Sequence, residues 1–245
     1  MLEPLAAIRE KADPSQGPWW TAPEAVEVWA TALAQENFMV FDDFLPPDAL
    51  SQMEAASAKL REGMSPGRTD SQMTASGRKD FVAWANPADH PELNGYVEHC
   101  NAIVTALMEL PLPRVQAKIQ GVSALSDVMF TRYPGGEADD ARYIRHVDNE
   151  DGRNGRLLTC ILYLNKEWDT KRDGGELRLF EPDRRTVKHD VAPVYNRLVT
   201  FFCDSDVPHE VRRAYRERHA AAIWYLNQDQ HLTYHAAAEA GATLQ

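Results

Sequence analysis

RLLTCILYLN (residues 156–165) is one of eight short runs that dominate the second half of this 245-residue chain. In each run a few apolar or β-branched residues alternate with polar ones and end near Gly, Pro, Asn or Asp. Such runs predict the strands of an all-β sandwich or jelly roll. The other seven are QAKIQGVS (116–123), DVMFTRYPGG (127–136), ARYIRHVDN (141–149), GELRLFEP (175–182), RLVTFFCDS (197–205), HEVRRAY (209–215) and RHAAAIWYLN (218–227).

The first half is predicted to be mainly helical. TAPEAVEVWATALAQEN (21–37) places apolar residues on one helical face, and Thr21 with Glu24 matches a capping box. Two more helices are expected at 46–63 and 90–111, where Pro and Gly mark the ends. Short strands are predicted at 38–46 and 78–86, with a loop at 63–77. The predicted fold class is therefore α+β, a double-stranded β-helix (jelly-roll) core with supporting N-terminal helices.

We expect one domain over residues 1–245. Residues 1–114 would give mainly helical support, 115–228 the jelly-roll core and 229–245 a C-terminal tail. The 44% hydrophobic and 26% charged residues are ordinary for a globular protein.

Charge and cysteine content exclude several classes of partner. The 26 basic and 37 acidic residues give a formal charge of −11, which repels phosphate backbones, so no nucleic acid partner is expected. RRAYRER (212–218) is the one local basic stretch. No apolar run approaches the roughly 20 residues of a membrane span, and the N-terminus does not resemble a secretory signal. Cys100, Cys160 and Cys203 are odd in number and widely spaced, which favours reduced thiols and a cytoplasmic protein.

RHVDN (145–149) raises the possibility of a metal site. Alternate residues of a strand point to one face, so His146 and Asp148 would project side by side. Two histidines and one carboxylate on one face of an iron leave the opposite positions open for oxygen chemistry. His209 opens a late strand that a jelly roll can bring close to this pair. Among the other histidines, His90 lies in a predicted loop, His99 on a predicted helix, and His231 and His235 in the polar tail.

Arg218, nine residues after His209, is a candidate anchor for a co-substrate carboxylate. A keto acid that chelates the iron needs a buried, planar and permanently charged partner for its far carboxylate. On spacing alone, Arg212, Arg213 and Arg216 remain competitors.

These residues resemble the signature of iron(II)- and 2-oxoglutarate-dependent dioxygenases. YPGGEADDARYIRHVDN, TCILYLNKEWD, GGELRLFEP, NRLVTFFCDSDVPHEV and RHAAAIWYLN are most similar to the prolyl hydroxylases that modify hypoxia-inducible factor, and to their bacterial relatives. The resemblance covers roughly residues 80–227 and keeps the motifs in order.

The resemblance implies a role for individual residues. His146, Asp148 and His209 would bind Fe(II), and Arg218 with Tyr163 would hold the distal carboxylate of 2-oxoglutarate. Tyr133 would form a hydrogen bond with the end of 2-oxoglutarate that chelates the metal. Thr159, Ile161 and Leu177 would surround the co-substrate. The implied substrate residues are Met129 and Trp224 in the cavity, Arg156 at its entrance, and Arg78 and Asp80 in a mobile loop that closes over the substrate.

The implied activity is peptidyl-prolyl 4-hydroxylation of a protein, with O2 as oxidant and ascorbate as a possible reductant. The products would be hydroxyproline, succinate and CO2, and in bacterial relatives the implied target is an elongation factor of the Tu type. One alternative is hydroxylation of a free amino acid or a small peptide natural product. A non-catalytic jelly-roll binding or sensor module and a zinc hydrolase with the same triad are alternatives from other classes. The oligomeric state stays open.

Overall fold

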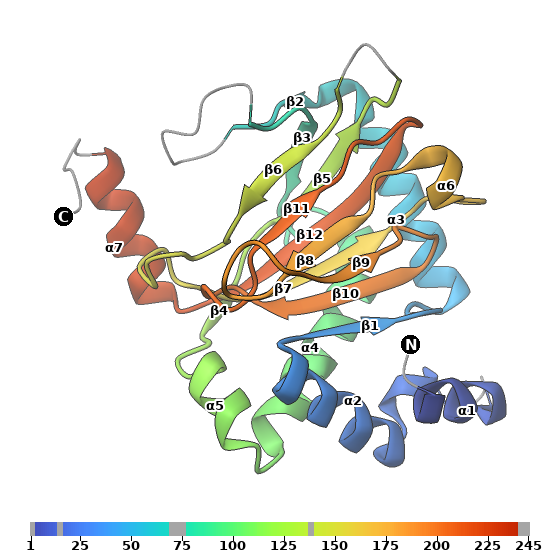
Figure 1. The fold of residues 1–245 in the computed structure, drawn as a ribbon, viewed down its shortest axis with the longest axis vertical. Coiled ribbons are helices and arrows are strands. Elements are labelled where there is room, and N and C mark those ends of the chain that lie inside the picture. The colour runs from blue at the N-terminus through green and yellow to red at the C-terminus, as the bar shows by residue number, and fades with distance from the viewer. Residues whose placement is uncertain (1–2, 14–16, 69–76, 137–139, 240–245) are drawn as a thin grey trace.

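Two antiparallel sheets face each other and form the core of the protein (Figure 1). The computed structural model describes residues 3–13, 17–68, 77–136 and 140–239. The larger sheet has the strand order β1-β10-β7-β12-β5-β3-β2, with β4 paired to β12, and the smaller one has the order β6-β11-β8-β9. The strands are β1 (Phe38–Phe41), β2 (Ser65–Pro66), β3 (Phe81–Ala85), β4 (Ala124–Leu125), β5 (Val128–Tyr133), β6 (Tyr143–His146), β7 (Arg156–Tyr163), β8 (Leu177–Phe180), β9 (Val187–Val191), β10 (Arg197–Phe202), β11 (His209–Val211) and β12 (Arg218–Leu226).

Helices from the first half of the chain support the larger sheet. The buried hydroxyl of Tyr96, on α4, donates to the carbonyls of Cys160 and Ala221, which lie on the central strands β7 and β12. These bonds fix α4 against the middle of the sheet. The helices are α1 (Glu3–Lys11), α2 (Pro23–Glu36), α3 (Pro47–Leu60), α4 (Asn94–Glu109), α5 (Pro113–Ile119), α6 (Thr170–Asp173) and α7 (Gln228–Glu239), with short 3-10 turns at Trp19–Thr21, Arg61–Gly63 and Pro91–Leu93.

The α+β jelly-roll prediction is confirmed, but one predicted strand is wrong. The first four residues of QAKIQGVS (116–119) lie in α5, which begins at Pro113 and buries Val115 and Ile119. A proline at the first helical turn favours this start, and the two apolar residues lie four positions apart on one helical face.

The predicted capping box is wrong, and two further elements were not predicted. Ala22 is the N-cap of α2, and the Thr21 hydroxyl donates instead to the Pro18 carbonyl at 2.7 Å. Most of the predicted tail is the helix α7, and β9 had no counterpart among the predicted strands. The division of the chain at 114 and 228 stays a prediction. Within the described ranges, no helix is long and apolar enough to cross a bilayer.

Candidate active site

Pairing within the smaller sheet brings the three candidate metal ligands together. His209, the first residue of β11, is the direct register partner of His146, the last residue of β6. Oδ1 of Asp148 lies 3.7 Å from Nε2 of each histidine. Asp148 occupies the turn after β6, so the predicted side-by-side projection from one strand is wrong. The turn, not strand alternation, directs the carboxylate toward the histidines.

Backbone carbonyls orient both imidazoles. Nδ1 of His146 lies 2.9 Å from the carbonyl of Ile144, and Nδ1 of His209 lies 3.0 Å from that of Val207. With the proton on Nδ1, each ring donates to its carbonyl and presents the lone pair of Nε2 to a metal ion. The local chain therefore selects the tautomer that binds a metal.

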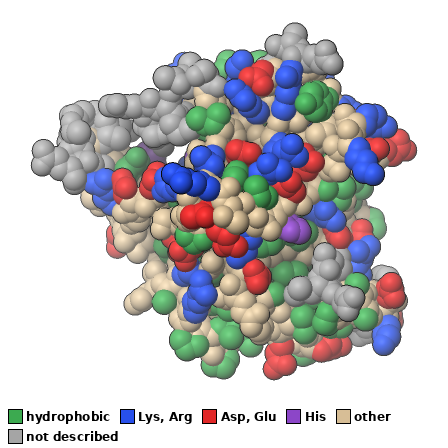
Figure 2. Space-filling view, in the orientation of Figure 1, with side chains coloured by type: hydrophobic (Ala, Val, Ile, Leu, Met, Phe, Trp, Pro, Cys, Tyr) green, Lys and Arg blue, Asp and Glu red, His purple; other side chains and the backbone are tan. Residues whose placement is uncertain are grey.

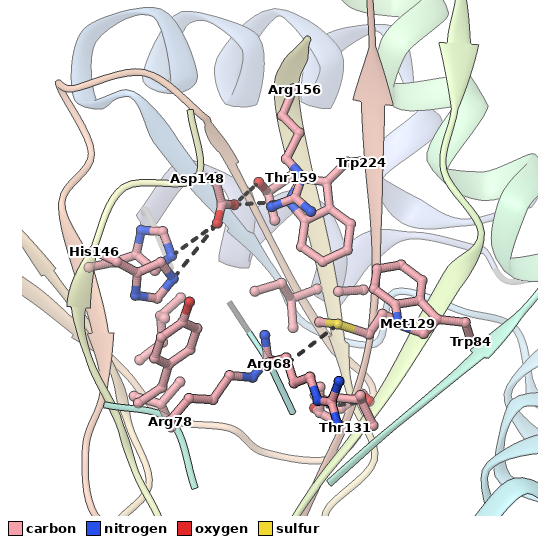
Figure 3. Close-up of a pocket in the computed structure, with 18 of the residues that line it drawn as sticks. Arg68, Arg78, Trp84, Met129, Thr131, His146, Asp148, Arg156, Thr159 and Trp224 are labelled. Carbon is pink, nitrogen blue, oxygen red and sulfur yellow. Dashed lines mark hydrogen bonds and ion pairs between the residues drawn. The ribbon is translucent and has the colours of Figure 1, made fainter. Parts of the chain in front are cut away.

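The second oxygen of Asp148 is held from the larger sheet (Figure 3). Oδ2 accepts a 2.6 Å hydrogen bond from the hydroxyl of Thr159 on β7 and a 2.9 Å bond from Nε1 of Trp224 on β12. Oδ1 is thereby left for a metal. Three ligand atoms on one side of an ion leave its other positions open, which is the donor set of non-haem iron oxygenases.

Burial and neighbouring charges shift the pKa values of His146 and Asp148. Burial, reinforced by the neighbouring His209, lowers the pKa of His146 to about 3. Burial alone would raise the pKa of Asp148, but the two histidines, Arg156 and the Thr159 hydrogen bond lower it below its ordinary value. At neutral pH the group therefore offers a neutral His146 and an ionised Asp148, as metal binding requires.

A cavity of about 1150 Å³ lies beside these ligands. Its wall includes residues of both sheets, and twelve of the fourteen residues singled out in the sequence belong to it. The two that do not line it are Tyr163 and Asp80, whose side chains are buried behind the surface. Those that line it are Arg78, Met129, Tyr133, His146, Asp148, Arg156, Thr159, Ile161, Leu177, His209, Arg218 and Trp224.

Arg218 forms a polar end to this cavity, and the buried ring of Tyr163 lies beside it. Arg218 is 2% exposed, and its Nε donates to the carbonyl of Gly175 at 2.8 Å. Its guanidinium carbon lies 5.0 Å from the ring centre of Tyr163 and 5.1 Å from that of Tyr133. No carboxylate of the described residues lies within ion-pair distance of Arg218. A buried guanidinium without an acidic partner fits an anionic ligand.

The hydroxyl of Tyr163 supports the same fit. It is buried and has no hydrogen-bond partner among the described residues. Burial raises the pKa of Tyr163, although Arg218 opposes this shift, so the hydroxyl stays protonated and able to donate. A buried orphan donor beside Arg218 fits the carboxylate of a keto acid such as 2-oxoglutarate.

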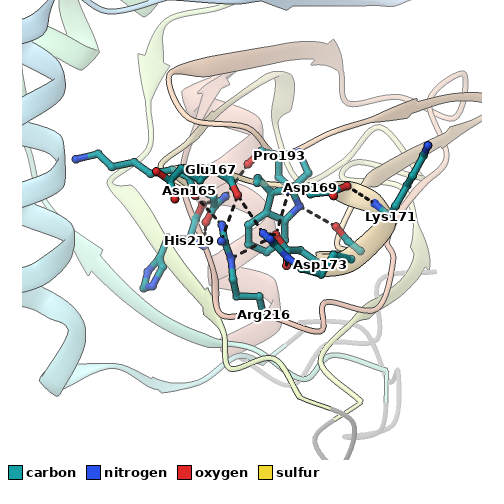
Figure 4. A network of polar contacts seen from close by, with 12 residues as sticks. Asn165, Glu167, Asp169, Lys171, Asp173, Pro193, Arg216 and His219 are labelled. Carbon is teal, nitrogen blue, oxygen red and sulfur yellow. Dashed lines mark hydrogen bonds and ion pairs between the residues drawn. The ribbon is translucent and has the colours of Figure 1, made fainter.

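A polar network holds the loop that contacts Arg218 (Figure 4). The buried carboxylate of Asp173 receives two bonds from Arg172, and Nε1 of Trp168 donates to the Gly174 carbonyl. Arg216 donates to the carbonyls of Lys166 and Glu167 at 2.7 and 3.3 Å. The neighbouring Gly175 has φ +73°, and an added Cβ there would lie 3.1 Å from Cδ of Arg218.

The basic stretch RRAYRER is used within the fold. Arg212 pairs with Glu176 at 3.4 Å, Arg216 binds loop carbonyls, and Arg218 enters the cavity wall. Of the four arginines that competed on spacing, Arg218 is the one that lines the cavity.

Arg78 and Asp80 form a buried ion pair at the cavity wall. Nε and Nη2 of Arg78 donate to the two carboxylate oxygens at 2.6 and 2.9 Å, and the Asp80 side chain is fully buried. Burial alone would lower the pKa of Arg78, but Asp80 raises it. Arg78 thus lines the cavity, while Asp80 holds the Arg78 guanidinium from the buried side. Residues 69–76 of the predicted loop lie outside the described residues.

Two aromatic residues that line the cavity, Tyr143 and Trp84, were not predicted from the sequence as site residues. The Tyr143 ring stacks on His146 with centroids 3.8 Å apart, and burial raises the pKa of Tyr143 to about 12. Trp84 on β3 is 49% exposed and lies 6.0 Å from the ring of Trp224. Tyr143 lies on the same strand as His146, three residues before it, so the sequence could have suggested that it lies near the site. Trp84 meets Trp224 across strands β3, β5 and β12, which sequence spacing does not reveal.

Comparisons with known proteins agree with this site. Residues 128–226 match the family model described as 2OG-Fe(II) oxygenase superfamily. The human protein "Prolyl hydroxylase EGLN3" is 32% identical over 217 residues, which cover 84% of this chain and 85% of the relative. A crystal structure of a Pseudomonas putida prolyl-4-hydroxylase has a TM-score of 0.67 at 29% identity and covers 82% of this chain and 98% of that one.

A further likeness concerns the fold alone. A Trichoplax adhaerens prolyl hydroxylase, solved in complex with a peptide fragment of the hypoxia-inducible factor oxygen degradation domain, has a TM-score of 0.75 at 22% identity. It covers 91% of this chain and 98% of that one. Taken with the two-histidine, one-aspartate group and the buried arginine at one end of the cavity, the comparisons establish that this chain belongs to the 2OG-Fe(II) oxygenase superfamily, as a homologue of the EGLN prolyl hydroxylases.

Proposed function

We propose that this protein is a peptidyl-prolyl 4-hydroxylase that acts on a protein substrate and uses Fe(II), 2-oxoglutarate and O2. The observation that carries the proposal is one cavity that joins the candidate metal ligands to Arg218. A zinc hydrolase with the same triad would have no use for a buried arginine and an orphan tyrosine hydroxyl beside it.

In this proposal His146, Asp148 and His209 hold the iron. The hydrogen bonds from Thr159 and Trp224 keep Oδ2 of Asp148 occupied, so that the carboxylate binds through Oδ1. When bound, Fe(II) and 2-oxoglutarate supply the oxidative decarboxylation that activates O2 for hydroxylation of a C–H bond.

The other cavity residues bind and orient the two organic substrates. Arg218 and Tyr163 would hold the distal carboxylate of 2-oxoglutarate, with Tyr133 near its chelating end and Thr159, Ile161 and Leu177 along its length. Trp224, Met129 and Trp84 present an apolar and aromatic surface that suits the small, apolar ring of a proline. Hydroxylation of this ring would produce hydroxyproline, succinate and CO2.

A protein target is favoured by the size of the cavity. About 1150 Å³ exceeds the roughly 300–1,000 Å³ of typical small-molecule sites. We propose a cytoplasmic protein, such as an elongation factor of the Tu type, as the target. The three free cysteines, all buried, are compatible with that compartment.

The test is succinate release with Fe(II), 2-oxoglutarate and air, together with mass spectrometry of proline-containing elongation-factor peptides and free L-proline. Oxygen insertion into a peptidyl proline, abolished by His146→Ala, would support the proposal. Modification of free proline alone would favour the small-molecule hydroxylase. Absence of succinate from iron-loaded protein would favour a binding module, and hydrolysis without 2-oxoglutarate consumption a zinc hydrolase.

A further inference from the structure

The wall of the cavity is rich in positive charge, although the whole chain carries a formal charge of −11. A surface drawn from 37 acidic and 26 basic residues would on average be acidic. Figure 2 shows Lys and Arg side chains gathered above the centre of the face in view, among fewer acidic ones. The cavity wall contains the basic residues Lys59, Arg68, Arg78, Arg145, Arg153, Arg156, Arg184 and Arg218, against the acidic residues Asp148, Glu150 and Asp151.

Several of these cations already have partners within the chain. The ion pairs are Arg184 with Glu150 at 2.5 Å, Arg153 with Asp151 at 2.7 Å, Arg78 with Asp80 at 2.6 Å and Lys59 with Glu92 at 3.8 Å. The first two pairs also neutralise two of the three acids in the wall. The third acid, Asp148, faces the histidines.

Arg68, Arg145 and Arg156 remain around the proposed substrate site. In the part of the chain that the structure describes, no carboxylate lies within ion-pair distance of these three. The guanidinium of Arg145 lies 5.0 Å from the ring centre of Phe180, and that of Arg156 lies 4.4 Å from Trp224. Contact with an aromatic ring restricts a guanidinium while its N–H groups stay able to bind carboxylates.

We propose that the substrate segment is acidic, with Asp or Glu side chains close to the target proline that pair with Arg68, Arg145 and Arg156. This inference rests on the proposed prolyl hydroxylase function and narrows its substrate class. Arg156 contacts Trp224, and Arg145 directly precedes His146. The cations are therefore placed beside the reacting position, where the flanking residues of an extended peptide would pass.

Binding of acidic and neutral peptides tests the proposal. The probes are three peptides with one central proline: one flanked by Asp and Glu, one by Asn and Gln of the same shape, and one by Lys. Their affinities for the full chain are measured by isothermal titration calorimetry, and their hydroxylation by mass spectrometry. Because three partly exposed pairs act together, we expect the acidic peptide to bind about tenfold more tightly than the neutral one at low ionic strength, with the difference shrinking in high salt.

A charge-reversed protein separates recognition from misfolding. In the double variant Arg68→Glu, Arg145→Glu, the Lys-flanked peptide is expected to bind more tightly than the acidic one. A damaged fold cannot produce such a gain. Lys11→Glu makes the same type of charge change at the end of α1, an exposed position on a distant helix, and should leave the order of the peptides unchanged.

The outcomes distinguish this inference from the proposed function. Equal binding and equal hydroxylation of all three peptides would overturn the acidic-segment proposal and leave the prolyl hydroxylase standing. If the acidic peptide binds more tightly but no peptide is hydroxylated, the acidic-segment proposal is supported and the proposed reaction is contradicted. If no peptide binds or reacts, both proposals fail.

Discussion

The hydroxyl of Thr159 donates a 2.6 Å hydrogen bond to Oδ2 of Asp148, the carboxylate oxygen that is not directed at the two histidines. The two residues lie on different parts of the jelly roll: Asp148 follows a strand of the smaller sheet, and Thr159 is on β7 of the larger one. A side chain of one sheet thus orients a candidate metal ligand of the other.

Removal of this donor should weaken iron binding. In Thr159→Val the shape is retained but the hydrogen bond is lost, and second-layer losses of this kind cost about 10–100-fold in metal affinity. Thr159→Ser keeps the hydroxyl and is the matched control. Anaerobic Fe(II) titration measures the effect; equal affinities for Thr159→Val and the unmodified protein would show that Asp148 needs no such support.

Tyr163→Phe should affect stability and co-substrate affinity in opposite directions. The hydroxyl is buried and has no partner in the part of the chain that the structure describes, so its removal should raise the free energy of unfolding of the ligand-free protein by about 1 kcal/mol. The same change removes a donor to the distal carboxylate of 2-oxoglutarate and should weaken its binding roughly 5–10-fold. Denaturant unfolding and 2-oxoglutarate titration measure the two effects. Unchanged affinity would place the co-substrate elsewhere.

Asp80→Asn should destabilise the fold. The Arg78 side chain is 12% exposed and that of Asp80 fully buried, so the substitution leaves a largely buried guanidinium without its counter-charge. Loss of one partner of a buried pair costs about 3–5 kcal/mol. Asp151→Asn breaks the exposed pair with Arg153 and should cost less than about 1 kcal/mol. Similar midpoints of urea unfolding for both variants would contradict this account.

The metal-free protein should lose stability in mild acid. Burial keeps His146 neutral in the fold and lowers its pKa to about 3, whereas an unfolded histidine titrates near pH 6.5. Below about pH 6.5 the unfolded chain therefore binds a proton that the fold excludes, and the free energy of unfolding decreases as the pH falls from about 6.5 to about 3.

The melting temperature in the presence of a chelator, followed against pH, tests this sign. His146→Gln should flatten the dependence, whereas His235→Gln, on α7, should leave its shape unchanged. A profile that is as steep in His146→Gln as in the unmodified protein would assign the acid sensitivity to other groups.

Much of the core was predictable because strand formation leaves a local signal. Seven of the eight runs contain a strand, since alternating apolar residues and turn residues act over a few positions. The exception, 116–123, begins inside α5, which starts at Pro113, and the buried residues Val115 and Ile119 of this helix have a helical spacing. The strand β9 was missed because VKHDV has little hydrophobic character and three exposed residues.

The sequence by itself determined the jelly-roll class, the family and the residue types of the site, because chain-local patterns and ordered motifs carry that information. Tertiary structure alone decided which atoms meet. It paired His146 with His209, turned Oδ1 of Asp148 toward both, and placed the Tyr163 hydroxyl beside Arg218, with no hydrogen-bond partner among the residues described. It also neutralised some cations of the cavity and left others available. These relationships depend on contacts between strands far apart in the chain, and sequence spacing does not encode the distances between them.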